Sequence, residues 1–170
     1  SVVAALTTGL SDDDSQVRLH AAEGLSRGAG TAASALSALA QRLGDGDAQV
    51  RRSAAVALGS IAPEVPSLPP IVVASLNVSL KDSDFKVRVA SAKTLVGLAR
   101  AAGGSVTNLM DGLKDEHPDL RAWCAVALGA MGAAAKAAVP ALTELTKDAD
   151  SFVSARARKA LEQIQSAPGP

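Results

Sequence analysis

Four Asp-x-Asp pairs recur along the chain, and a single pair of this kind could hold a divalent cation in a sugar- or phosphate-handling enzyme. The pairs are Asp12/Asp14, Asp45/Asp47, Asp82/Asp84 and Asp148/Asp150. A catalytic motif usually occurs once, with phosphate-binding neighbours, whereas this one returns in phase with a hydrophobic repeat. An aspartate just before a helix can instead accept hydrogen bonds from the first free backbone N–H groups. We therefore interpret the second aspartate of each pair as a helix cap.

Other residue types that could carry chemistry are few. His20 and His117 have no Cys, Asp or Glu partner at metal-ligand spacing, and the chain contains neither a GxSxG nucleophile motif nor a GxxxxGK[ST] phosphate loop. Cys124 is the single cysteine and stands in a row of small residues, so we expect it to be buried in packing. The sequence therefore predicts a non-enzymatic protein with no catalytic site, metal or cofactor.

Composition and charge narrow the class further. The 170 residues include 36 Ala but only two Phe, one Trp and no Tyr. Such small residues favour closely packed helices over a β-sandwich. Seventeen basic and seventeen acidic side chains cancel, which argues against a nucleic-acid or anionic-membrane binder. No apolar run approaches the roughly 20 residues of a membrane span, so no membrane association is expected.

Self-similarity gives the organisation of the chain. Five 14-residue segments align without gaps, and their starts are separated by 33, 37, 33 and 33 residues. The segments begin at Asp12, Asp45, Asp82, Asp115 and Asp148. Apolar or small residues at positions 6, 10, 14 and 17 of each segment trace one stripe of a helix. A second apolar pattern precedes each segment, so the sequence predicts an all-α fold of five helical hairpins.

The hairpins define the expected domain organisation. We predict a single domain at 1–165 and a flexible tail at 166–170. The units are about 1–30, 31–62, 71–103, 104–132 and 133–165, with a proline-rich loop at 62–70.

The repeated pattern Asp-x-Asp-x-x-Val-Arg-x-x-Ala-Ala-x-x-Leu-Gly, best seen from Asp45 to Gly59, resembles the HEAT repeat proteins of the phycobilisome-lyase-like subclass. The resemblance implies a right-handed α-solenoid, an armadillo-like superhelix with first helices on the convex side and second helices on the concave side. It also implies an Asp–Arg hydrogen-bonded ladder between repeats, in which Ser154 puts the last rung in doubt. The matching positions are Asp12, Arg18, Asp45, Arg51, Asp82, Arg88, Asp115 and Arg121.

The concave face is the expected binding surface, formed by positions 5, 9, 12 and 16 of each segment. The only tryptophan, Trp123, stands there, and tryptophan anchors commonly contribute about 2 kcal/mol or more to interfaces. The alternative is that Trp123 fills space between the fourth and fifth units. The candidate binding residues are Trp123, Val56, Val126, Phe152, Lys93, Arg156, Lys159 and His20.

The two ends of the array differ. Position 11 is Ala in four units but Arg158 in the last, which is typical of a polar terminal repeat. The segment from Val2 to Leu10 carries no charge, so we expect further repeats, another domain of the same polypeptide or a second copy of the chain to cover it. Self-association through this first helix is therefore one expected outcome.

These features favour a protein-interaction scaffold or accessory binding module whose partner is a protein or peptide. One alternative is a bilin-lyase-like component acting on a tetrapyrrole, which the family resemblance permits although the chain has no Tyr and only two His. The other is a nucleic-acid-binding HEAT-like module. Residues 1–85 hold six basic and nine acidic side chains, and residues 86–170 hold eleven and eight, which does not favour it.

Overall fold

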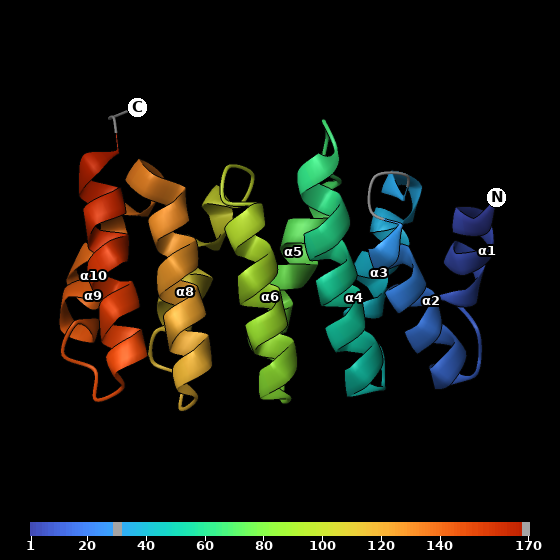
Figure 1. The fold of residues 1–170 in the computed structure, drawn as a ribbon, viewed down its shortest axis with the longest axis horizontal. Helices are drawn as coiled ribbons and strands as arrows, with labels where there is room; N and C mark the ends of the chain where they lie inside the picture. Colours follow the sequence, from blue (N-terminus) through green and yellow to red (C-terminus); the bar gives the residue numbers. More distant parts are fainter. Residues whose placement is uncertain (29–31, 168–170) are drawn as a thin grey trace. The chain divides into compact units, whose positions relative to one another are not determined.

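The structure, a computed structural model, describes residues 1–28 and 32–167, which form helices and turns without a strand (Figure 1). Each repeat is a pair of helices. The first helices are α1 (Val2–Gly9), α3 (Leu36–Arg42), α5 (Pro70–Ser79), α7 (Val106–Gly112) and α9 (Val139–Leu145). The second helices are α2 (Ser15–Arg27), α4 (Ala48–Ile61), α6 (Phe85–Gly97), α8 (Pro118–Met131) and α10 (Ser151–Ser166).

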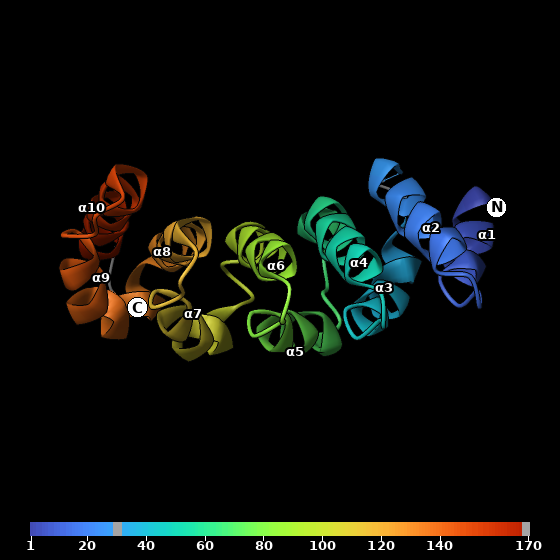
Figure 2. The same cartoon turned by 90° about the horizontal axis from the view of Figure 1, so that it is seen from below.

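The chain divides into two compact units, residues 1–94 and residues 95–170. In the first unit, α3 and α5 lie on one side while α2 and α4 lie on the other (Figure 2). In the second unit, α7 and α9 lie on one side while α8 and α10 lie on the other. Second helices pack side by side within each unit, α2 against α4 and α8 against α10. Each unit is therefore a stack of hairpins with a layer of first helices and a layer of second helices.

The same turn joins the two helices of every hairpin. In each, the N–H of the aspartate at position 1 donates to the carbonyl three residues earlier, over 3.1–3.3 Å. The donors are Asp12, Asp45, Asp82, Asp115 and Asp148, and the acceptors are Gly9, Arg42, Ser79, Gly112 and Leu145. The five aligned segments are thus equivalent in structure as well as in sequence.

The core of each unit is built from the predicted apolar stripes. The leucines of the first helices, Leu39, Leu76, Leu109 and Leu142, are fully buried, and so are Leu58 and Leu128 in the second helices. Several members of the second-helix stripes are not buried as predicted: besides Gly28, which is exposed, they include Val17 and Leu161. Val17 is 41% exposed, and Leu161 is half-buried. Val17 belongs to the first described hairpin and Leu161 to the last.

The connections between hairpins are short helical turns where the structure describes them. They are η2 (Ala33–Ala35), η3 (Ala62–Glu64), η4 (Gly103–Ser105) and η5 (Gly132–Ala138). The first part of the proline-rich segment 62–70 is thus helical, and Pro70 begins α5, where proline is tolerated because that N–H needs no partner. The predicted unit boundary at 30/31 and residues 168–170 of the predicted tail lie outside the described residues.

One long apolar stretch differs from the expectation that no apolar run approaches the length of a membrane span. Pro118–Leu145 is long and apolar enough for a membrane span by composition alone. The backbone does not continue as one helix, because α8 ends at Met131 and Gly132 takes a positive φ of 55°. The stretch therefore comprises α8, η5 and α9, and 44% of its most apolar window is buried inside the fold.

Candidate functional site

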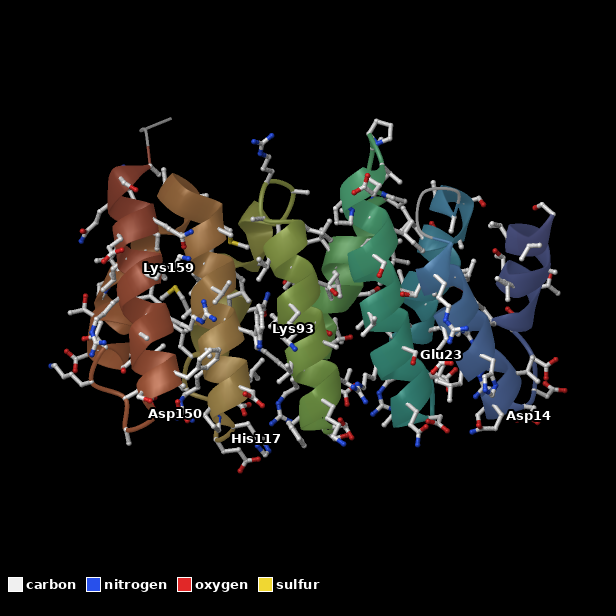
Figure 3. The ribbon with its side chains drawn as sticks, in the orientation of Figure 1. Asp14, Glu23, Lys93, His117, Asp150 and Lys159 are labelled. Carbon is white, nitrogen blue, oxygen red and sulfur yellow. The ribbon has the colours of Figure 1, made fainter. Side chains whose placement is uncertain are left out.

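The Asp-x-Asp pairs are used by the backbone. Asp14, Asp47, Asp84 and Asp150 each accept the N–H two residues ahead, over 2.7–2.8 Å, and so begin α2, α4, α6 and α10. Figure 3 shows Asp14 and Asp150 at the starts of their helices. His117 precedes Pro118 at the start of α8 without a side-chain cap bond. Within residues 1–28 and 32–167, no group of three or more His, Cys, Asp or Glu is arranged to hold a metal ion.

The first aspartate of a segment receives the arginine of the preceding hairpin. Arg18 Nε lies 2.8 Å from Asp45 Oδ2, and Nη2 lies 2.9 Å from Oδ1. Arg51 holds Asp82 in the same way at 2.7 and 2.8 Å, and Arg121 holds Asp148 at 2.8 and 2.9 Å. We call these paired contacts the Asp–Arg ladder.

Each ladder arginine also binds its own hairpin. The Nη1 group donates to the carbonyl oxygen of the aspartate at position 1, over 2.8–2.9 Å. These pairs are Arg18 with Asp12, Arg51 with Asp45, Arg88 with Asp82 and Arg121 with Asp115. Because a rung joins the arginine of one hairpin to the aspartate of the next, Ser154 does not remove the rung between Arg121 and Asp148.

The ladder changes the acidity of its carboxyl groups. The hydrogen bond from Arg18 lowers the pKa of Asp45, and that from Arg121 lowers the pKa of Asp148. These side chains are only 2% and 10% exposed. The charged aspartates and arginines of the ladder are therefore committed to holding hairpins together and are not available as catalytic groups.

The remaining candidates for chemistry have structural surroundings. Cys124 is fully buried, and burial raises the pKa of its thiol, so it is not an activated nucleophile. His20 is exposed on α2, where its Nδ1 lies 2.7 Å from the Gln16 carbonyl oxygen. His117 lies at the start of α8, with Nε2 3.6 Å from Glu116 Oε1.

In the first unit, the exposed side of α2 and α4 contains two neighbouring depressions of about 390 and 340 Å³. They share Glu23, Arg52 and Ser53, so we treat them as one surface and name it the α2–α4 groove. Its other lining residues are Leu19, Ser26, Arg27, Ala48, Gln49, Val56, Asp84 and Lys86.

The charges of this groove are available to a ligand. Among the residues that the structure describes, neither the Glu23 carboxylate nor the Arg52 guanidinium forms an ion pair. Val56, a predicted binding residue, is 47% exposed beside them. Lys93 is also exposed, on α6 seven residues after Lys86, and Figure 3 labels Glu23 and Lys93 on this face. The groove thus offers opposite charges beside a small apolar area.

In the second unit, the predicted binding residues lie on α8 and α10, which pack against each other. Phe152 is 44% exposed, and the Arg156 guanidinium lies 4.7 Å from the centre of its ring, a cation–π contact. Trp123, Val126 and Arg156 are half-buried, whereas Lys159 is exposed. Trp123 therefore contributes both to packing and to the surface. Its half-buried position is intermediate between the two interpretations of this residue, an exposed binding anchor and a side chain that fills space between the fourth and fifth units.

Arg52, like every other lining residue of the groove except Val56, was not selected as a binding candidate from the sequence. It occupies position 8 of its segment, one helical turn before Val56 at position 12, and so shares the edge of that face. Position 8 is occupied by the apolar residues Leu19, Val89 and Ala122 in other segments. The charge of Arg52 at this position could therefore have indicated an exposed binding residue from the sequence alone.

Comparison with known proteins places these features in a family. The family described as HEAT repeats matches residues 3–78 and 72–162. No curated protein sequence matches the chain significantly.

Several solved structures are similar to the chain. The complex of CpcE and CpcF of phycocyanin lyase from Nostoc sp. PCC7120 is 27% identical with a TM-score of 0.78, over 98% of this chain and 66% of that chain. An engineered protein is also 27% identical, with a TM-score of 0.77, over 96% of this chain and 79% of that chain. A designed armadillo repeat protein in complex with the peptide (KR)4 is 20% identical, with a TM-score of 0.83 over 95% of this chain and 81% of that one, and it supports the fold alone.

The predicted fold class and the predicted resemblance are both confirmed by these matches. The family match, the five equivalent hairpins and the Asp–Arg ladder lead to one conclusion: the chain belongs to the HEAT repeat family, with a phycobilisome-lyase-like pattern.

Proposed function

We propose that the chain is a non-enzymatic interaction scaffold that binds a peptide segment of a partner protein on the exposed side of its second helices. The observation that carries the proposal is the pair of uncommitted charges, Glu23 and Arg52, in the α2–α4 groove. The other reactive side chains are buried, cap helices or form the ladder, apart from the two histidines, His20 and His117. The exposed groups that remain, Glu23 and Arg52 among them, can form contacts with a binding partner.

The groove suits a ligand with both signs of charge. A carboxylate attracts a lysine or arginine side chain, and a guanidinium can hold a carboxylate through two parallel hydrogen bonds. Ser53 and Gln49 add hydroxyl and amide groups that can pair with a peptide backbone. An extended peptide presents such groups at regular intervals, which matches a row of parallel helices.

The second unit adds a different kind of contact. Phe152, held under Arg156, and the half-buried Trp123 provide aromatic surface on α10 and α8. Aromatic side chains dominate many protein interfaces because they bury large areas with little loss of freedom. We infer that this surface contributes an apolar anchor site.

Fluorescence anisotropy with three labelled peptides of equal length tests the role of the groove. One alternates Lys and Glu, one carries only Lys with neutral spacers, and one carries only Glu. We expect the wild type to prefer the alternating peptide, with an affinity that falls as salt increases. Arg52→Glu should shift the preference by about tenfold toward the Lys peptide.

The matched control is Lys136→Glu, which reverses an exposed charge on η5, outside the residues that line the groove. It should leave the order of the three peptides unchanged. The proposal fails if no peptide binds, or if Lys136→Glu and Arg52→Glu change the order equally.

One alternative remains because of a specific comparison. The likeness to the phycocyanin lyase complex, at 27% identity, keeps a bilin-binding role under consideration. The chain has no Tyr and only two His, His20 in the first hairpin and His117 in the fourth, so it offers few of the side chains that would hold a tetrapyrrole. Titration of the protein into a bilin solution should leave the absorbance spectrum unchanged, and a shifted and intensified band would favour the lyase-like role instead.

A further inference from the structure

The α2–α4 groove follows the length of its two helices. Its lining residues on α2 extend from Leu19 to Arg27, and those on α4 extend from Ala48 to Val56. At a rise of about 1.5 Å per residue, each series covers roughly 12 Å of helix. Because α2 and α4 pack side by side (Figure 1), the long direction of the groove is that of the helix axes and does not cross the row of second helices.

The two ends of the groove have different linings. One depression reaches the start of α6 at Asp84, and we call it the Asp84 end. The other is lined by Ser26, Arg27 and Val56, and we call it the Arg27 end. Ser26 Oγ lies 3.1 Å from Ser60 Oγ, one helical turn beyond Val56 on α4, so α2 and α4 touch where the groove ends.

The Arg27 end carries an excess of positive charge. Arg27 and Arg52 are exposed and line it together with Glu23, so two positive groups face one negative group. Glu23 precedes Arg27 by four residues, a spacing that allows an ion pair on a helix. Within the part of the chain that the structure describes, however, neither arginine forms an ion pair.

This excess identifies the group that the Arg27 end fits. Guanidinium groups hold carboxylates through parallel hydrogen bonds, and the Ser53 hydroxyl adds a further donor. One excess positive charge matches a single carboxylate better than a phosphate group, which carries nearly two negative charges. The Arg27 end therefore suits an Asp or Glu side chain of a ligand.

The Asp84 end offers carboxylate oxygens instead. Asp84 Oδ1 accepts the N–H of Lys86 at 2.8 Å, which leaves the other oxygen of this carboxylate for a ligand. Glu23 lines both depressions and so adds a second carboxylate at this end. Arg52 and Lys86 balance these two acids, so the Asp84 end is neutral where the Arg27 end is positive. An ammonium or guanidinium group of a ligand is better placed here than beside the two arginines.

We propose that the bound peptide segment lies along α2 and α4, with an acidic side chain between Arg27 and Arg52 and a basic side chain beside Glu23 and Asp84. The proposal rests on the peptide-binding role proposed above and specifies the course of the ligand and the order of its charges. An extended chain rises about 3.3 Å per residue, so a groove of roughly 12 Å holds an acid and a base about three residues apart.

Nuclear magnetic resonance of the full chain labelled with ¹⁵N tests the course of the ligand. The probe is a short peptide with one Glu and one Lys separated by two neutral residues. One version carries a nitroxide spin label beside the Glu, and the other carries it beside the Lys. We expect the first to broaden the amide signals of Arg27 and Val56 most, and the second those of Gln49 and Lys86.

The same spectra separate this proposal from the proposed function. Two labels that broaden signals at one level of different helices, or that broaden identical signals, would overturn the course along α2 and α4 while peptide binding itself stands. If neither this peptide nor the alternating Lys and Glu peptide shifts any signal, both proposals fail.

Arg27→Gln tests the acid-binding end. We expect the affinity for the unlabelled probe to fall at least about fivefold, and the affinity for a probe with Gln in place of Glu to stay unchanged. Arg100→Gln is the matched control, because it removes an exposed arginine outside the groove lining and should change neither affinity. Unchanged thermal unfolding of Arg27→Gln confirms that the fold is intact. Equal losses for the two probes, or for the two variants, would overturn the proposal.

Discussion

Arg18 and Asp45 meet through two parallel hydrogen bonds of 2.8 and 2.9 Å, across the boundary between the first two hairpins. Asp45 Oδ1 also accepts the N–H of Asp47 at 3.0 Å, next to the start of α4. One carboxylate therefore joins the end of one turn, the start of one helix and the neighbouring hairpin. A forked contact of this kind fixes direction as well as distance, so it sets the register in which the apolar surfaces stack.

Replacement of Asp45 by Asn tests the energetic weight of this contact. The amide keeps the size of the side chain but loses the charge that pairs with Arg18. We expect the free energy of unfolding to fall by about 1–3 kcal/mol in urea titrations. Asp13→Asn is the matched control, since Asp13 is exposed and contributes only its backbone carbonyl to Arg18. An equal loss in both variants would contradict a role for the rung.

The ladder also predicts how stability depends on pH. Asp45 and Asp148 have pKa values lowered by their arginine partners, below the ordinary value of about 3.9. A carboxyl group of this kind stabilises the fold fully above its unfolded pKa, and the contribution is lost as the pH falls through the folded pKa. The free energy of unfolding should therefore decrease from about pH 5 to pH 2, and less steeply for Asp45→Asn than for the wild type.

Urea titrations at several pH values across this interval measure the two slopes. Parallel slopes for wild type and Asp45→Asn would show that other carboxyl groups cause the acid sensitivity.

Much of the fold follows from local patterns in the sequence. The Asp at position 1, the apolar stripe and the leucines before each turn recur in every hairpin, and each carries its own local preference for a cap, a helix or a turn. These patterns predicted the hairpins and the burial of Leu58 and Leu128. The family resemblance implied a ladder at these positions, and the structure describes the rungs Arg18–Asp45, Arg51–Asp82 and Arg121–Asp148.

What the patterns did not predict depends on neighbours. Val17 fits the buried stripe as well as Val50 does, yet Val17 is 41% exposed whereas Val50, on the helix against which α2 packs, is fully buried. The register of the ladder likewise could not be read from spacing, because Asp12 and Arg18 are close in sequence while the ion pair joins Arg18 to Asp45. Arg52 was missed for a related reason: its long side chain reaches the groove from the edge of the face.

Buried leucines at position 14 should dominate stability. Leu58→Ala and Leu128→Ala each empty a fully enclosed site and should cost about 2–5 kcal/mol in the free energy of unfolding. Leu161 occupies the same position in the last hairpin but is half-buried, so Leu161→Ala should cost clearly less. Equal costs at the three positions would mean that the last hairpin is covered by something in solution.

Cys124 reports on opening of the second unit. Because the thiol is buried and burial raises its pKa, a disulfide reagent at neutral pH should react with it only when the surrounding helices separate. Labelling should be complete in seconds in strong denaturant and far slower in buffer. Fast labelling of the native protein, followed by absorbance, would show that α8 is not held as the structure describes.

The close approach of α7 and α8 gives a paired test of packing. A methyl group added at Gly112 would lie 2.5 Å from Cys124 Sγ, so Gly112→Ala should destabilise the chain by about 1–3 kcal/mol. Removing the sulfur by Cys124→Ala leaves residue 124 Cβ 3.6 Å from the added methyl, an ordinary contact. The double variant should therefore lose less than the sum of the two single variants, by about 0.5 kcal/mol or more. Gly103→Ala is the control, since no atom lies within 4 Å of a methyl group there. Additive losses would show that the helices separate to accept the methyl group, and the close packing of α7 on α8 would then not be what holds this hairpin together.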